Sequence, residues 1–258
     1  MKISAVIITL NEERDIARCL VSLQDIVDEV VVVDSGSTDR TEEICREHNT
    51  RFFHHPWAGY SEQKNYANTL ATNNWILSID ADEALSETLR QSVLELKNTY
   101  IAENQVFSVN RLTNYCGSWI RHCGWYPDRK VRLFCRNAKR WQGDIHETLA
   151  DTAGTTTETT LQGDLLHYSY HSVEQHIRQA DKFTTLTAQQ AFEKGKKASL
   201  ASIIFKPRWK FCRDYFFKLG FLDGYAGYQV CKISAFATFL KYSKLRMLCK
   251  SNKKNSEQ

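Results

Sequence analysis

Short apolar runs alternate with segments of helical periodicity through the first hundred residues. Four runs rich in β-branched or aromatic residues predict strands, at residues 3–8, 30–33, 51–55 and 75–80. Between the first two runs, apolar side chains recur at helical spacing, at Ile16, Cys19, Leu20 and Leu23. The run at 30–33 is apolar on both faces, as parallel strands covered by helices are. The pattern therefore predicts an α/β fold with a doubly wound, mainly parallel sheet.

Polar and charged residues predict where the helices begin. Asn11 is the expected N-cap of the first helix, and the second has Asp39 in its first turn, where a negative charge suits the helix dipole. A third helix is expected over residues 61–72, and a fourth begins near Ser86. Later elements are expected as strands over 105–134, a loop over 141–147, and mainly helices from Ser172. We therefore expect three segments, 1–100, 101–171 and 172–258.

The composition is that of an ordinary soluble protein. Of the 258 residues, 42% are apolar, which is enough for one large domain or for a domain with an appendage. No stretch approaches the roughly 20 apolar residues of a membrane-spanning helix. The start, MKISAVIITLNEERD, has acidic and polar residues too early for a signal peptide. We therefore expect a cytosolic protein.

Eight cysteines are scattered along the chain. Reduced thiols are expected for a cytosolic protein. A zinc site is the alternative for the group Cys116, His122, Cys123 and Cys135. This group has no CxxC pair, whereas structural zinc usually takes a closely spaced pair. The spacing therefore favours free thiols.

The net charge of +4 conceals two electrically different regions. From residue 200 onward the chain has twelve basic and three acidic residues, a net charge of +9. The rest of the chain therefore carries −5. Aromatic side chains are interleaved with these basic residues between Lys206 and Lys250. Anionic lipid attracts basic residues, and aromatic residues favour the membrane interface. This end is therefore predicted to attach to the inner membrane surface. Core packing and a nucleic-acid surface are the alternatives, but no nucleic-acid-binding motif accompanies it.

Polar residues follow the predicted strands at their carboxyl ends. Thr9, Asn11 and Glu12 follow the first strand, and Asp80 and Asp82 follow the fourth. Strand alternation would place both aspartates on the same side, where they could hold an oxygen-ligated divalent ion shared with a phosphate. The alternative is that these acids cap the helix near Ser86. Ligands of such sheets bind beyond the carboxyl ends of the strands.

Asp34 lies at the carboxyl end of the second strand, within DSGSTD. Gly36 permits close backbone approach, Ser35 offers a hydroxyl, and the carboxylate can accept hydrogen bonds from a nucleoside. A dinucleotide fold is the rival interpretation. The first strand–helix turn is TLNEERD and lacks GxGxxG, so the phosphate cradle of that fold is missing.

Four motifs in this order resemble the nucleotide-binding half of the family 2 inverting glycosyltransferases, which have the GT-A fold: TLNEERDIARCL, VVVDSGSTDRT, QKNYA and WILSIDADE. The resemblance continues through RLF, WQGDIHETL, GDLLHYSY and FFKLGFLDGYAGY. These later motifs resemble the bacterial enzymes that add β-linked glucose to heptose in the lipopolysaccharide inner core. The resemblance implies a nucleotide-sugar-binding half over 1–100, an acceptor half with the base over 101–171, and a helical region over 172–258.

The resemblance also implies residue roles in donor binding. The segment Thr9, Leu10, Asn11 and Glu12 would contact the nucleoside, and Asp34 would bind the uracil. Ser35 and Gly36, in the same loop, are also expected to bind the nucleotide sugar. Lys64 matches a basic position near the donor. Asp80 would face the ribose or the hydrated metal, and Asp82 would bind the metal, Mg²⁺ or Mn²⁺. Ala81, between them, is expected at the nucleotide sugar. Asp39 is a helix cap rather than a ligand.

Two later positions have open roles. His167 is a second candidate near the metal or diphosphate, and its alternative is a structural histidine. Arg132, with Lys130, contacts the diphosphate or an anionic acceptor, or else lies on a solvated strand face.

An inverting displacement needs a base opposite the leaving diphosphate. The resemblance places it in GDIHETL, where Glu147 is the expected base and His146 is the alternative base or an orienting residue. The expected activity is transfer of a sugar from a UDP-sugar to a heptose of inner-core lipopolysaccharide, and the resemblance implies that the sugar is glucose. Transfer to a polyprenyl phosphate or another glycan is the rival reaction. A non-catalytic nucleotide-binding module is the second class.

Overall fold

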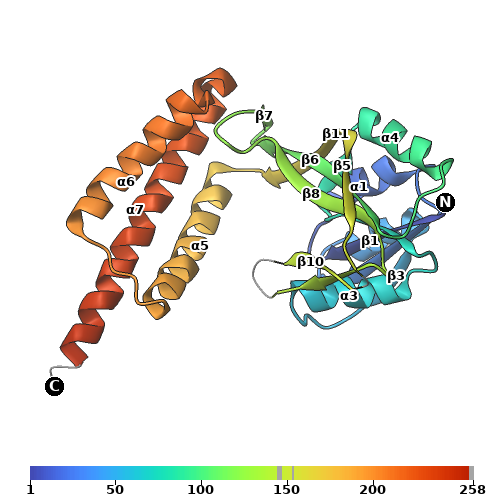
Figure 1. The fold of residues 1–258 in the computed structure, drawn as a ribbon, viewed down its shortest axis with the longest axis horizontal. Helices are drawn as coiled ribbons and strands as arrows, with labels where there is room; N and C mark the ends of the chain where they lie inside the picture. Colours follow the sequence, from blue (N-terminus) through green and yellow to red (C-terminus); the bar gives the residue numbers. More distant parts are fainter. Residues whose placement is uncertain (144–146, 153, 256–258) are drawn as a thin grey trace. The chain divides into compact units, whose positions relative to one another are not determined.

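The computed structural model describes residues 1–143, 147–152 and 154–255. The chain forms two compact units. The first consists of Met1–Leu112 with Pro127–Tyr168, and the second of Thr113–Tyr126 with Ser169–Gln258. Each is described on its own below (Figure 1).

The first unit begins with a parallel half-sheet. Its strands β1 (Ile3–Thr9), β2 (Glu29–Asp34), β3 (Arg51–His54) and β4 (Trp75–Ser78) pair in the order β3-β2-β1-β4. The register sets Thr9 beside Asp34, so the carboxyl ends of β1 and β2 lie together. The predicted α/β fold and the strands near 3–8, 30–33, 51–55 and 75–80 are confirmed.

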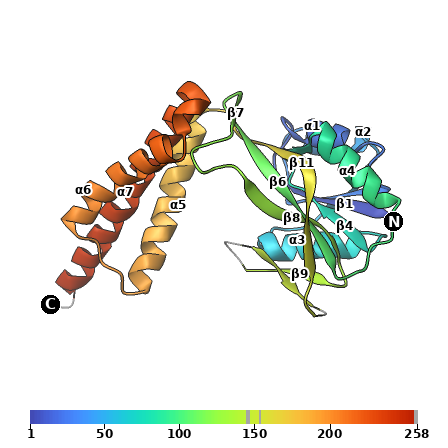
Figure 2. The same ribbon diagram turned by 45° about the horizontal axis from the view of Figure 1, so that its top comes forward.

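Helices cover both faces of this half-sheet. Ile3, Ala5 and Ile7 of β1 point into a core shared with the helices α1 (Ile16–Leu23), α2 (Thr41–Glu47) and α4 (Glu87–Lys97). The neighbouring Val6 points to the other face, into a core shared with α3 (Tyr60–Leu70). Figure 2 shows α3 on one side of the sheet and α1, α2 and α4 on the other. Burial on both faces explains why these strands are almost wholly apolar.

The sheet continues in antiparallel fashion beyond β4. The full order is β3-β2-β1-β4-β8-β6-β11-β5, where the later strands are β5 (Glu83–Leu85), β6 (Gln105–Tyr115), β8 (Asp128–Cys135) and β11 (Thr157–Tyr170). The strands predicted over 105–134 are thus present. A separate hairpin joins β9 (Lys139–Gln142) to β10 (Thr148–Asp151). The loop expected over 141–147 is therefore wrong at its start: Trp141 is a buried strand residue, because its ring packs edge-on against Phe134.

The second unit is mainly helical, as predicted from Ser172, whose hydroxyl caps the first of its helices. The short strand β7 (Ser118–Ile120) precedes α5 (Val173–Glu193), α6 (Leu200–Cys212) and α7 (Gly224–Asn255). A π-helical turn and a 3₁₀ turn separate α6 from α7. Both α5 and α6 pack against α7, which lies between them in Figures 1 and 2. In the described residues, no helix is long and apolar enough to cross a membrane.

The cysteines that suggested a zinc alternative have other surroundings. Cys135 packs in the apolar core of the first unit, and Cys123 in that of the second, where its thiol donates to the carbonyl oxygen of Gly227. His122 pairs with Asp223 at 2.7 Å. All eight cysteines are free thiols. Within 1–143, 147–152 and 154–255, no group of three or more His, Cys, Asp or Glu residues is arranged to hold a metal by itself.

Candidate active site

The carboxylates after β4 lie in a turn. Strand β4 ends at Ser78, and the backbone N–H of Glu83 donates to the carbonyl oxygen of Asp80 at 2.9 Å, which closes a turn over Asp80–Ala81–Asp82 before β5. The expectation that strand alternation aims both aspartates at one point is therefore wrong, since the chain has left the strand. Capping of α4 by these acids is also excluded, because the Ser86 hydroxyl caps that helix.

A buried ionic network anchors this turn. Arg132 on β8 donates through Nη2 to Asp80 Oδ2 at 2.8 Å and to Glu83 Oε1 at 2.5 Å. Glu83 is 1% exposed, and its other oxygen accepts from the backbone N–H of Asp80 at 3.0 Å. Arg111 lies 3.6 Å from Glu83 and is also bound to Asp128. Since buried charges require partners, Glu83 is a structural acid that holds the turn on Arg132.

Arg132 is thus buried, so its alternative assignment to a solvated strand face is wrong. Burial lowers its pKa, but the adjacent carboxylates of Asp80 and Glu83 raise it well above the ordinary value. Lys130 is more exposed and pairs with Asp128 at 3.1 Å. Ala81, between the two aspartates, is buried in the core.

Lys64 links the turn to the candidate base. Its buried Nζ lies 3.2 Å from Asp80 Oδ1 and 3.0 Å from Glu147 Oε1, and 4.7 Å from the centre of the Trp141 ring. Burial raises the pKa of Asp80, yet Arg132 and Lys64 outweigh this and hold it well below its ordinary value. The predicted donor residue and the predicted base thus meet at a single ammonium group. His146 lies outside the described residues.

Asp82 has a different partner. His167 on β11 lies with Nε2 3.2 Å from Asp82 Oδ2. The antiparallel pairing of β11 with β5 places His167 opposite Glu83, and the backbone N–H of Tyr168 donates to the carbonyl oxygen of Asp82. The structure therefore brings together two of the residues that the sequence placed near the metal, Asp82 and His167; a metal bound by them stays a prediction.

The surroundings of Asp82 carry surplus negative charge. Burial, and then repulsion from Asp82 and neighbouring acids, raises the pKa of Glu12 to about 8. A divalent cation in this region would relieve the repulsion. Asp82 and His167 fit such an ion, because Mg²⁺ typically takes only one or two protein carboxylates beside phosphate oxygens.

The loops after β1 and β2 form the expected nucleoside region. The carboxylate of Asp34 accepts from the backbone N–H groups of Gly36 and Ser37 and from the Ser37 hydroxyl. Gly36 has φ +99°, a conformation that favours glycine. Asp34 thus organises its own turn, and its contact to a uracil stays a prediction.

Asn11 joins the two loops and does not cap a helix. It has φ +57°, its backbone N–H donates to Ser37, and its side-chain oxygen accepts from the backbone N–H of Thr38. Helix α1 starts only at Ile16, so the expected N-cap is wrong. Asp39 accepts from the backbone N–H and the hydroxyl of Thr41 at the start of α2, as expected of a capping acid.

Leu10 and Ser35 lie in the same two loops, Thr9 is the last residue of β1, and the contacts of all three with a nucleotide stay predictions. Leu10 is half exposed, and the Ser35 hydroxyl accepts from the side-chain amide of Gln63. The buried hydroxyl of Thr9 has no hydrogen-bond partner within the part of the chain that is described. A ligand acceptor or donor at the strand ends would satisfy it.

Sequence reasoning missed Glu83, Arg111 and Trp141 as parts of this site. Glu83 was visible as a third acid in WILSIDADE, but only its burial beside Arg132 identifies its role. Trp141 precedes the HE pair in WQGDIHETL, and its contact with Lys64 follows from the hairpin β9–β10.

Comparison with known proteins gives consistent results. Residues 4–134 match the family described as "Glycosyl transferase family 2". An uncharacterized glycosyltransferase of Rickettsia typhi is 33% identical over 96% of this chain and 87% of its own length. The lipopolysaccharide core biosynthesis glycosyltransferase LpsC of Rhizobium meliloti is 31% identical over 95% of this chain and 92% of its own.

Among solved structures, the chain is similar to S. aureus TarS 1–349, with a TM-score of 0.48 and 14% identity over 94% of this chain and 91% of that one. The family match covers just over half of the chain, and the two relatives cover nearly all of it. The protein therefore belongs to glycosyl transferase family 2.

Proposed function

We propose that the chain transfers a sugar, with glucose suggested by the resemblance, from a UDP-sugar to a heptose of the lipopolysaccharide inner core, with inversion and with a divalent cation. One observation carries the proposal: the buried ammonium of Lys64 lies within 3.2 Å of both Asp80 and Glu147. A residue of the donor half and the candidate base of the acceptor half thereby share one cation.

The proposed binding of the UDP-sugar depends on a cation that its diphosphate would share with the protein. Asp82 and His167 would hold the divalent cation, which neutralises a leaving diphosphate when bound. Burial is the main reason that the pKa of Glu12 is raised, and repulsion from Asp82 and other nearby acids adds to it, so a cation here would relieve part of the cost. The loops joined by Asn11 and Ser37 would receive the nucleoside.

Glu147 is the proposed general base. The acceptor oxygen would attack the anomeric carbon as the bond from that carbon to the diphosphate oxygen breaks, and the hydroxyl proton would pass to Glu147. Lys64 would play two parts. It pairs with Glu147 in the structure, and an arriving diphosphate would compete for the same ammonium and leave the carboxylate free to take a proton.

The acceptor assignment has a separate basis. The relative LpsC is named for lipopolysaccharide core biosynthesis, and it aligns over almost the whole of this chain. Transfer to a polyprenyl phosphate or another cell-surface glycan is the rival reaction. The donor sugar is a separate question, because glucose and galactose differ only in the orientation of one hydroxyl group.

The test is a product assay with purified full-length protein. It would be incubated with a panel of UDP-sugars, Mg²⁺ or Mn²⁺, and lipopolysaccharides truncated at successive core positions, and the products weighed by mass spectrometry. We expect one hexose to be added to an acceptor that ends in heptose. An unchanged mass across the panel would remove the lipopolysaccharide assignment, and transfer to a polyprenyl phosphate alone would establish the rival. Donor binding without transfer to any acceptor would indicate a nucleotide-binding module.

A further inference from the structure

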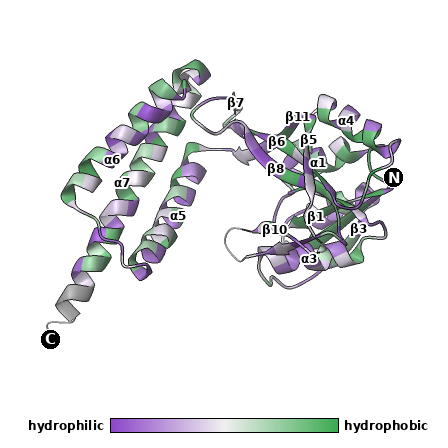
Figure 3. Cartoon of the chain, in the orientation of Figure 1, coloured by the Kyte–Doolittle hydropathy of each residue, from purple (hydrophilic) through white to green (hydrophobic). Residues whose placement is uncertain are grey.

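The helices of the second unit leave large apolar side chains uncovered. Helix α6 buries none of its thirteen residues. Phe205 and Trp209 on α6 are 67% and 59% exposed, and Phe217 in the following turn is 73% exposed. Figure 3 shows hydrophobic and hydrophilic residues alternating along α6 and α7. Exposed apolar surface on this scale marks an interaction site.

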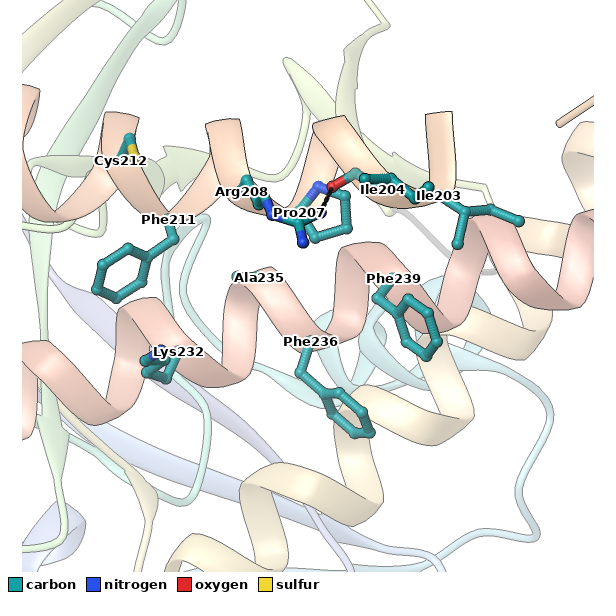
Figure 4. A pocket seen from close by; sticks show the side chains of 10 residues that line it. All are labelled: Ile203, Ile204, Pro207, Arg208, Phe211, Cys212, Lys232, Ala235, Phe236 and Phe239. Atoms are coloured by element: carbon teal, nitrogen blue, oxygen red, sulfur yellow. Dashed lines mark hydrogen bonds between the residues drawn. The ribbon is translucent and has the colours of Figure 1, made fainter. Parts of the chain in front are cut away.

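An open groove of about 680 Å³ runs between α6 and α7 (Figure 4). Its walls are almost entirely apolar and include Ile203, Phe211 and Phe239. Two basic residues, Arg208 and Lys232, also line it. Lys232 places its Nζ 4.8 Å from the centre of the Phe211 ring, so a positive charge stands beside the apolar wall. A groove of this kind suits a ligand with an apolar chain and an anionic group.

The charge that faces solvent is positive. Asp214 is buried and pairs with Lys210 and Arg213, and the Asp223 side chain is buried against His122. These are the acids between residues 200 and 255. Basic residues therefore dominate the exposed surface of α6 and α7. A second copy of the chain would bring like charge against like charge, whereas an anionic surface is complementary.

We propose that the surface formed by α6, the following turn and α7 docks on a bilayer of anionic phospholipid. Phe205, Trp209 and Phe217 enter the interfacial region, and the α6–α7 groove takes an acyl chain whose phosphate lies at Arg208 and Lys232. The proposal rests on the second unit alone and does not depend on the transferase reaction.

Sedimentation of the full-length protein with vesicles tests the proposal. We expect binding to vesicles of equal parts phosphatidylcholine and phosphatidylglycerol, and little binding to phosphatidylcholine alone. The double variant Phe205→Ser with Trp209→Ser should lose binding, whereas Tyr100→Ser, an exposed aromatic in the first unit, should retain it. Arg208→Gln and Lys232→Gln should each weaken binding roughly fivefold, and Lys2→Gln should not.

Three results would overturn the proposal. Equal binding to neutral and anionic vesicles would remove the role of charge, and unchanged binding of the Phe205→Ser, Trp209→Ser variant would remove the apolar surface. A protein that binds no vesicle and forms a dimer broken by that variant would assign the surface to a second copy. Transfer to a lipid-free acceptor should be the same in all these variants. Loss of vesicle binding is therefore separable from failure of the proposed reaction.

Discussion

The two units of the chain use charge in opposite ways. In the first, acids surround two buried cations: Arg132 holds Asp80 and Glu83, and Lys64 holds Asp80 and Glu147. In the second, the side chains of Asp214 and Asp223 are buried, and the basic residues of α6 and α7 face outward among aromatic rings. Buried ion pairs fix side chains in one geometry, whereas exposed charges act on a partner. The first arrangement suits chemistry and the second suits docking.

The packing of the two units differs in the same sense. Branched aliphatic residues fill the cores on both faces of the sheet in the first unit. In the second, a small cluster joins Ala188 and Ala191 of α5 to Leu245 of α7, and α6 buries no residue. The first unit therefore gains stability from its interior, whereas much of the apolar surface of the second remains available.

The largest effect should come from Asp82. Asp82→Ala removes a proposed cation ligand in the first unit, and a bound cation contributes several kcal/mol to a transition state. We expect a loss of transfer rate on the order of 10³-fold with either Mg²⁺ or Mn²⁺. Glu158→Ala, which removes an exposed acid on β11 of the same unit, should keep the wild-type rate. Full activity of Asp82→Ala, or full activity in EDTA, would break the link between this carboxylate and a cation.

The same replacement in the two units should separate buried from exposed charge. Arg132→Met leaves Glu83 without its closest cation, and removal of one partner of a buried pair costs about 3–5 kcal/mol. Arg208→Met, at an exposed position on α6, should change the free energy of unfolding by less than about 0.5 kcal/mol. Urea unfolding of both variants measures this. Equal losses of unfolding free energy in the two variants would contradict the contrast between buried charge in the first unit and exposed charge in the second.

Ionic strength should affect the two units to different extents. Raising ionic strength from about 0.1 M to about 1 M shortens the Debye length from about 10 Å to about 3 Å. Vesicle binding by the second unit should weaken by roughly an order of magnitude, because its basic residues are exposed. The stability difference between wild type and Arg132→Met should change little, because that pair is buried. Vesicle binding that is indifferent to salt would contradict the assignment of the exposed charge.

A pH dependence is also expected in the first unit. Glu12 has a pKa of about 8 in the folded protein, above its ordinary value of 4.5. Between these values the folded state keeps a proton that the unfolded state has released, so stability should fall as pH rises from about 5 to about 8. Glu12→Gln removes this contribution and should give a flatter profile of urea midpoint against pH. Parallel profiles would show that Glu12 does not carry the effect.

Much of the first unit was predictable because each signal was local. Apolar runs flanked by helical periodicity gave the parallel strands, and a capping acid such as Asp39 acts within a few residues. The contacts that define the site could not be predicted, since they join residues far apart in sequence: Lys64 and Glu147 are 83 positions apart, and Arg132 and Glu83 are 49 apart. The failure of strand alternation at Asp80 and Asp82 has the same origin, because Arg132 fixes a turn where the local pattern continued a strand.

The proposed mechanism depends most on Glu147 as the base, and a single-turnover transfer assay of Glu147→Gln tests this role most directly. Glutamine keeps an oxygen that can accept from Lys64 but cannot take the acceptor proton. We predict a rate lower by about 10²–10⁴-fold, with UDP-sugar affinity within about twofold of wild type and with Glu158→Gln unaffected. A wild-type rate of transfer by Glu147→Gln would contradict the assignment of Glu147 as the general base.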